Sequence, residues 1–138
     1  MLTKKSGEKI PAVWIPPDGV FSAVIEGVQF AEATVGMTTL PVWHVSAIVA
    51  DDLTGATWEA TATLPLTQSG LYRVFRLIKA TGAPLDLSSI NLREDGARLV
   101  GLPLRVRVVG RLLPRGPDGE RRGWTSLIVR FLADGEVD

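Results

Sequence analysis

The chain has 138 residues, which suits one domain, and its 46% hydrophobic and 22% charged residues exclude wholesale disorder. Fifteen basic and fifteen acidic residues give a formal net charge of zero, so no overall charge attracts a polyanion. The absence of cysteine excludes disulfides and thiolate metal sites, and no apolar run approaches the roughly 20 residues that span a bilayer.

The arginines gather in the second half of the chain. Residues 98–130 contain eight arginines but only Asp118 and Glu120 as acidic residues, whereas residues 134–138 contain three acidic residues. Local potential steers a polyanion more than net charge does, so the basic half is the candidate for nucleic-acid contact. The first nine residues carry charge without the apolar stretch of a signal peptide, and we expect a soluble, cytoplasmic protein.

The chain begins with residues 1–18, which are polar or rich in proline and predict an N-terminal arm. Residues 20–30 read as a long strand with a bend at Gly27, and residues 40–50 as a second strand after a loop. Residues 57–64 predict a third strand after a turn. Alternation predicts these inward side chains: Trp43, Val45, Ala47 and Val49 from the second strand, and Trp58, Ala60, Ala62 and Leu64 from the third.

The periodicity then changes to that of a helix. Leu71, Val74, Phe75 and Ile78 follow the i, i+3, i+4, i+7 pattern, which predicts one amphipathic helix. We expect Thr67 or Ser69 to cap its start and Gly82 to end it.

Two strands and a short tail complete the chain. Residues 104–111 predict a fourth strand, residues 114–122 a hairpin loop rich in Gly and Pro, and residues 123–132 a fifth strand. Residues 19–132 would form one domain, and residues 133–138 a short acidic tail that we interpret as a frayed terminus. The expected inward side chains are Leu104, Val106 and Val108, then Leu127, Val129 and Phe131; the expected outward ones on the fifth strand are Trp124, Ser126, Ile128 and Arg130.

Three strands, one helix and two strands form the element order of an oligonucleotide/oligosaccharide-binding (OB) fold. We therefore predict an all-β fold with one helix, a five-stranded Greek-key barrel in the chain order β-β-β-α-β-β. An SH3-like or split barrel is the rival fold, but those barrels rarely carry a three-turn amphipathic helix after the third strand.

Two stretches resemble small phage-encoded single-stranded DNA-binding proteins. They are residues 71–82, a helix that runs into a glycine, and residues 99–108, which open the fourth strand with a Leu-x-Gly pattern. Leu102-Pro103 stands where that family more usually has Gly-Lys. The resemblance implies sequence-tolerant binding of single-stranded DNA in replication, recombination or repair, in the host cytoplasm if the chain is phage-encoded, with replication or recombination proteins as further partners.

Sequence-tolerant binding needs cations for the phosphates and flat side chains on which bases stack. The predicted cations are Arg105, Arg107, Arg111, Arg115, Arg121 and Arg122. The plainer interpretation, that such arginines only keep the surface soluble, stays open, most of all for Arg105 and Arg107.

Trp124 is the main stacking candidate, because alternation places it outward beside the basic loop. Trp43 and Trp58 remain stacking candidates although their alternation favours the core. His44 is a surface candidate for contact with a base or phosphate. Glu59 lies on the predicted outward face of the third strand, where it would repel phosphate.

Nothing in the sequence indicates catalysis. A single histidine without a recognisable nucleophile, and no phosphate-binding or zinc-protease motif, argue against an enzyme, a metal site or a cofactor. The prediction is therefore a DNA-binding module, and whether it forms a homo-oligomer stays open. The alternative is a protein–protein or structural OB module of a phage assembly that binds no nucleic acid.

Overall fold

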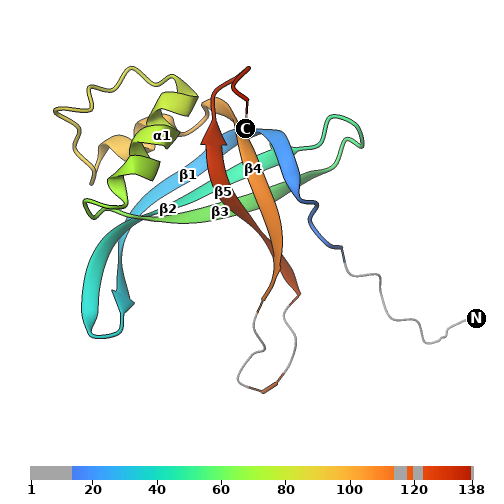
Figure 1. Ribbon diagram of the computed structural model, residues 1–138, viewed down its shortest axis with the longest axis horizontal. Coiled ribbons are helices and arrows are strands. Elements are labelled where there is room, and N and C mark those ends of the chain that lie inside the picture. The colour runs from blue at the N-terminus through green and yellow to red at the C-terminus, as the bar shows by residue number, and fades with distance from the viewer. Residues whose placement is uncertain (1–13, 114–117, 120–122, 138) are drawn as a thin grey trace, which may run out of the picture.

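The computed structural model describes residues 14–113, 118–119 and 123–137. These ranges contain five strands, one α-helix and one 3₁₀ helix (Figure 1). The predicted order of three strands, a helix and two strands is present, and the 3₁₀ helix η1 lies in a segment for which no element was predicted. In chain order the elements are β1 (Gly19–Val35), β2 (Thr38–Ala50), β3 (Thr57–Pro65), α1 (Leu71–Thr81), η1 (Asp95–Leu99), β4 (Pro103–Leu112) and β5 (Trp124–Leu132).

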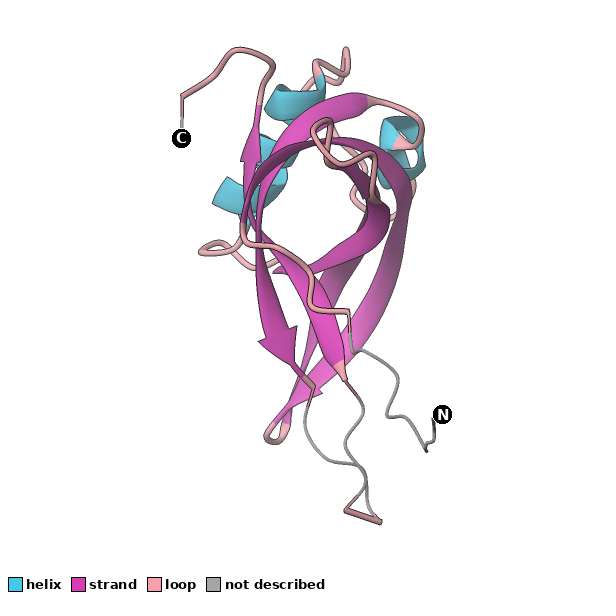
Figure 2. Ribbon diagram, turned by 90° about the vertical axis from the view of Figure 1, so that its right-hand side faces the viewer, coloured by secondary structure: helices cyan, strands magenta, loops and turns pink. Residues whose placement is uncertain are grey.

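The strands close into a barrel whose spatial order, β1-β2-β3-β5-β4, differs from their order along the chain (Figure 2). The chain enters β4 after α1, pairs it antiparallel with β1, and returns through β5 to the space between β4 and β3. The β3–β5 pair is parallel and short, whereas the other pairs are antiparallel. The β1–β2 hairpin, the end of β4 and the start of β5 project to the same side of the barrel, away from α1 (Figures 1 and 2).

Alternation predicted the interior of β2, β3 and β4 correctly. All the inward side chains predicted for these three strands are buried. Trp43 is fully buried, and its indole N–H donates to the carbonyl of Leu92 at 2.7 Å. Trp58 is 8% exposed, and its indole N–H donates to the hydroxyl of Ser126 at 3.1 Å. The two predicted core tryptophans thus have partners for their polar atoms, as buried indoles require.

Of the inward side chains predicted for β5, Phe131 is buried, but Leu127 and Val129 are not. Ser126 and Ile128 are buried, whereas Val129 is 40% exposed. The cause is a register shift: Arg107 pairs with Arg130, but the next residue of β4, Val108, pairs with Ile128, so that Val129 is an extra residue. Such a bulge reverses the facing of every residue on one side of it. A similar shift between Ile25 and Gly27 places a bulge in β1, where the sequence predicted a bend.

Helix α1 covers one end of the barrel and buries Val74, Leu77 and Ile78 against the core. The predicted cap by Thr67 or Ser69 was wrong, because their hydroxyls contact each other at 3.3 Å and the N-cap is Gly70. A side chain at Gly70 would meet the carbonyl oxygen of Pro65, which explains the glycine. The predicted end at Gly82 is confirmed, with φ of 73° in the left-handed region.

The described ends of the chain pack against the barrel. Residues 14–18, the end of the predicted arm, bring Asp18 to the backbone N–H of Gly110, which donates to its carboxylate at 2.7 Å. Pro16 is buried beside Gly110, where a Cβ would lie 2.8 Å from the carbonyl oxygen of Pro16. No helix among the described residues is long and apolar enough to cross a membrane.

Candidate functional site

A groove of about 640 Å³ lies on the outer face of β1, β2 and β3. The space of the groove exists because Gly27 of β1, Ser46 of β2 and Thr61 of β3 are register partners with small or absent side chains. Ala97 and Val100, in and just after η1, form one wall. A second row of register partners, Gln29, His44 and Thr63, also lines the groove.

The row of register partners that contains Thr61 continues beyond the groove toward β4. Thr61 is the register partner of Leu127 on β5, and Leu127 is the partner of Val109 on β4. Val109 lies between Arg107 and Arg111, two of the predicted cations. The register therefore connects the uncharged groove with the basic strand through neighbouring positions on the outer surface.

His44 is exposed, as predicted, and its Nδ1 lies 3.1 Å from the hydroxyl of Thr63. The imidazole, this hydroxyl and the Gln29 amide present hydrogen-bond donors and acceptors to the groove. Such groups can hydrogen-bond to the edge of a base or to a sugar.

Glu59 is exposed on the outer face, as predicted, and Glu26 at the β1 bulge is its neighbour. A hydrogen bond from side chain to side chain between them raises the pKa of Glu26, with smaller contributions from desolvation and from the charge of Glu59. A pair that shares a proton carries less negative charge than two separate carboxylates. The groove side of the barrel is therefore neutral to acidic.

The arginines of β4 lie on a different part of the barrel from His44, because β1 separates β4 from β2. Arg107 faces Arg130 across the β4–β5 pair, and Arg111 faces Thr125. Arg107 is half-buried, whereas Arg111 is exposed. Two of the predicted cations thus flank the outer face of the β4–β5 hairpin.

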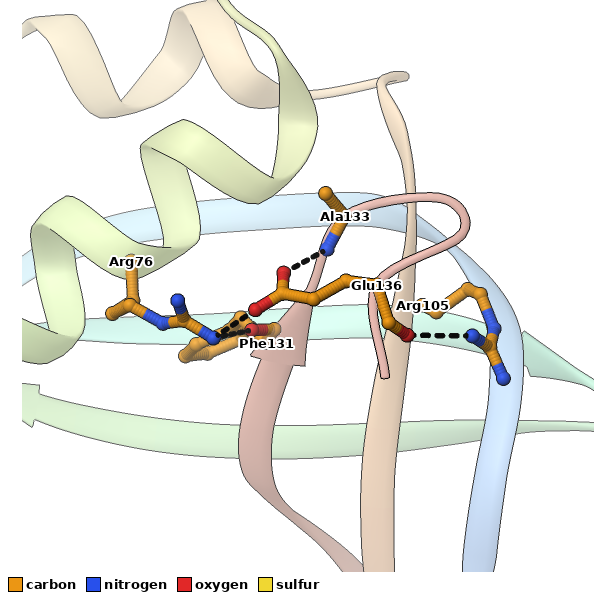
Figure 3. Close-up of polar contacts among 5 residues, drawn as sticks. All are labelled: Arg76, Arg105, Phe131, Ala133 and Glu136. Atoms are coloured by element: carbon orange, nitrogen blue, oxygen red, sulfur yellow. Dashed lines mark hydrogen bonds and ion pairs between the residues drawn. The ribbon is translucent and has the colours of Figure 1, made fainter. Parts of the chain in front are cut away.

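Arg105 contacts the C-terminal tail (Figure 3). Its guanidinium donates to the carbonyl oxygen of Glu136 at 3.2 Å, and the carboxylate of Glu136 accepts from Arg76 at 2.7 Å and from the backbone N–H of Ala133 at 2.9 Å. These contacts lower the pKa of Glu136, first through the Ala133 N–H and then through Arg76. The interpretation of the tail as a frayed terminus is therefore wrong at Ala133 and Glu136, which these contacts hold in place.

The four tryptophans divide into two buried and two exposed side chains. Trp43 and Trp58 belong to the core, so neither offers a free face to a base. Trp14 is 54% exposed and packs on Trp58 with ring centroids 5.7 Å apart. Trp124 is 37% exposed, and its partner across the hairpin is Leu112, which is 38% exposed.

The predicted outward facing of Trp124 needs correction. Trp124 lies two residues before the buried Ser126 and four before the buried Ile128, so its side chain is on the same side of β5 as theirs. It is nevertheless exposed, because it is the first residue of the strand. It remains at the root of the basic hairpin, one position from the Arg111–Thr125 pair. Arg115, Arg121 and Arg122, the loop cations, lie outside the described residues.

Apart from His44, the residues of the groove and its small-residue row were not predicted from the sequence. No signal in the separate strands connects Gly27, Ser46 and Thr61, because only the strand register aligns them. No group of three or more His, Asp or Glu residues able to hold a metal occurs in the described part of the chain. No protein-family model matches this sequence, and no curated protein is significantly similar to it.

Proposed function

We propose that the protein is an OB barrel that binds single-stranded DNA without sequence preference. The observation that carries the proposal is the strand order: β5 lies between β3 and β4 in a closed five-stranded barrel, and α1 connects β3 to β4. This order and this helix position are typical of OB barrels.

The second support is the position of the groove. OB barrels bind oligonucleotides on the face of their second and third strands, between the loops that follow the first and fourth strands. Here His44, Ser46, Thr61 and Thr63 of β2 and β3 line the groove, and both hairpins project to the same side of the barrel. Bases would lie in the groove, where hydrogen-bonding groups are neutral.

The third support is the distribution of charge. Arg107 and Arg111 flank Val109, which the register connects with the groove through Leu127. Phosphates would follow these arginines, while Trp124 and Trp14 offer exposed rings for stacking. Stacking and counterion release together give affinity without base selection. The resemblance to phage proteins adds replication, recombination or repair as the process served.

A fluorescence titration tests the proposal. Oligo-dT added to the protein at two salt concentrations should quench the exposed tryptophans, and the logarithm of the binding constant should fall with a slope near −0.7 for each phosphate neutralised. Binding that is absent, or that has no salt dependence, would contradict the proposal.

One observation favours the alternative, a protein-binding module without nucleic acid. The outer face of β1 and β2 exposes Val24 and Ile48, which are register partners, next to the acidic pair Glu26 and Glu59. Such a face suits contact with a protein better than contact with phosphates. Failure of the dT titration would leave this function as the one to pursue.

A further inference from the structure

Tyr72 forms a ridge on the outer side of α1, with a hollow on each side of it. Its side chain is 70% exposed and lines both hollows. The first, which we term the arginine hollow, measures about 170 Å³ and is lined by Tyr72, Arg73, Arg76, Val129, Arg130 and Phe131. The second, the apolar hollow, measures about 280 Å³, and its apolar lining is Phe75, Ile78, Ala83, Leu85 and Leu87.

Contacts with β5 fix the cations of the arginine hollow. The guanidinium of Arg73 donates to the carbonyl of Ile128 at 3.2 Å and lies 5.9 Å from the centroid of the Phe131 ring. Arg76 donates to the carbonyl of Phe131 at 3.4 Å. Carbonyl acceptors orient a guanidinium and leave its positive charge in place. Two preorganised cations of α1 therefore line a hollow of about 170 Å³.

Glu136 shows that Arg76 can pair with a carboxylate. Its Oε2 lies 2.7 Å from Arg76, and both Arg76 and Arg130 favour its ionised form. The two side chains of the ion pair are 26% and 32% exposed, so water and salt screen the contact. Exposed ion pairs of this kind contribute little to stability, which makes the tail carboxylate displaceable.

The tail contacts Arg76 but lines neither hollow. Val137, the apolar neighbour of Glu136, is 88% exposed, and no residue of 133–137 lines the apolar hollow. Leu87, at the edge of that hollow, is 42% exposed. A longer acidic segment with a large apolar side chain could place carboxylates beside the arginines and the apolar side chain in the apolar hollow at the same time.

We propose that the two hollows around Tyr72 form a docking site for an acidic peptide segment of a partner protein, with carboxylates in the arginine hollow and an adjacent apolar side chain in the apolar hollow. The surface uses α1 and the second half of β5, whereas the proposed DNA surface uses β1–β3 and the β4–β5 root. The docking site does not depend on the proposed function.

Fluorescence anisotropy with a labelled peptide tests this site. The probe is a decapeptide with three consecutive glutamates followed by leucine and phenylalanine; one control peptide has glutamine for the glutamates, and another has serine for the two apolar residues. The probe should bind the full chain, and each control peptide should bind on the order of tenfold more weakly, since the glutamine peptide loses its three ionic contacts and the serine peptide loses its apolar burial.

Protein variants assign the binding to the two hollows. Glu136→Gln should tighten peptide binding by about two- to fivefold, because the tail no longer competes for Arg76. Asp134→Asn removes the same charge from the tail without a contact to Arg76 and should have less effect. Arg73→Gln and Leu87→Ser should each weaken binding, whereas Arg98→Gln and Leu53→Ser, at exposed positions elsewhere, should not.

Three results would overturn the proposal. The first is no binding of the probe to the full chain or to the Glu136→Gln variant. The second is equal binding of the probe and the serine peptide, which would show a purely ionic contact. The third is competitive displacement of the probe by oligo-dT together with weaker DNA binding of Arg73→Gln, which would assign the arginine hollow to DNA.

Discussion

The two sides of this barrel share one core and differ in charge. The outer face of β1, β2 and β3 presents small, neutral side chains and the acidic pair Glu26–Glu59, while the outer face of β4 and β5 presents Arg107, Arg111 and Arg130. A net charge of zero therefore conceals a division of surface chemistry. Affinity for a polyanion would come from one side and the accommodation of bases from the other.

Trp43 lies beneath the groove side and Trp124 at the root of the basic side. Replacing Trp43 with alanine should mainly lower stability, whereas replacing Trp124 with alanine should mainly weaken DNA binding. Trp43 is fully buried beneath the groove side, so Trp43→Ala should lower the free energy of unfolding by about 3–5 kcal/mol. Trp124→Ala should leave stability within about 1 kcal/mol and weaken oligo-dT binding by about 1–3 kcal/mol. Urea denaturation and dT titration measure the two quantities. Equal losses of stability would contradict the assignment of Trp124 to the surface.

A negative charge in the groove should impair binding more than the same charge farther along β3. Thr61 lines the groove, whereas Thr57 lies at the start of the strand, and both are two residues from Glu59. Thr61→Glu should weaken dT binding on the order of tenfold, and Thr57→Glu about twofold or less. The reason is that repulsion between the new carboxylate and the DNA phosphates falls with the distance between them. Equal effects of the two variants would show that the groove has no special role.

Loss of one cation from the basic side should appear in the salt dependence. Arg111→Gln should reduce the magnitude of the salt slope by about 0.7, the value for one phosphate contact on a single strand. Arg98→Gln, an equal change of charge in η1, should leave the slope unaltered. A slope that changes equally in both variants would indicate that only overall charge matters.

The smallest expected effect concerns the acidic pair. Because the pKa of Glu26 is raised above its ordinary value of 4.5, the folded protein retains this proton longer than the unfolded chain does. The pair therefore costs stability as pH rises from about 4.5 through the folded-state pKa. Glu59→Gln should remove that loss, so urea midpoints of variant and wild type should diverge in favour of the variant between acidic and neutral pH. Parallel midpoints across this range would argue against a shared proton.

Patterns among residues close together in the chain were enough to predict much of the fold. Period-2 alternation identified the inward residues of β2, β3 and β4, and the i, i+3, i+4, i+7 pattern located α1 and its end at Gly82. These features depend on residues close together in the chain. They are therefore readable from the sequence alone.

Features that depend on pairing between distant segments were not predictable in this way. The extra residue Val129 reverses the facing of the first half of β5, and only the register with β4 reveals it. The contact of Glu136 with Arg76 joins residues 60 positions apart. The groove at Gly27, Ser46 and Thr61 likewise exists only once three strands are aligned, which is why the predicted site contained arginines and aromatics but no member of that row.

We propose that single-stranded DNA crosses the barrel from the groove to the β4–β5 root. Amide chemical-shift mapping of the isotopically labelled protein with oligo-dT tests this path. We expect the largest shifts at Ser46, Thr61, Leu127, Arg111 and Trp124, with small shifts along α1. Shifts confined to α1 and the tail, or no shifts at saturating oligo-dT, would contradict it.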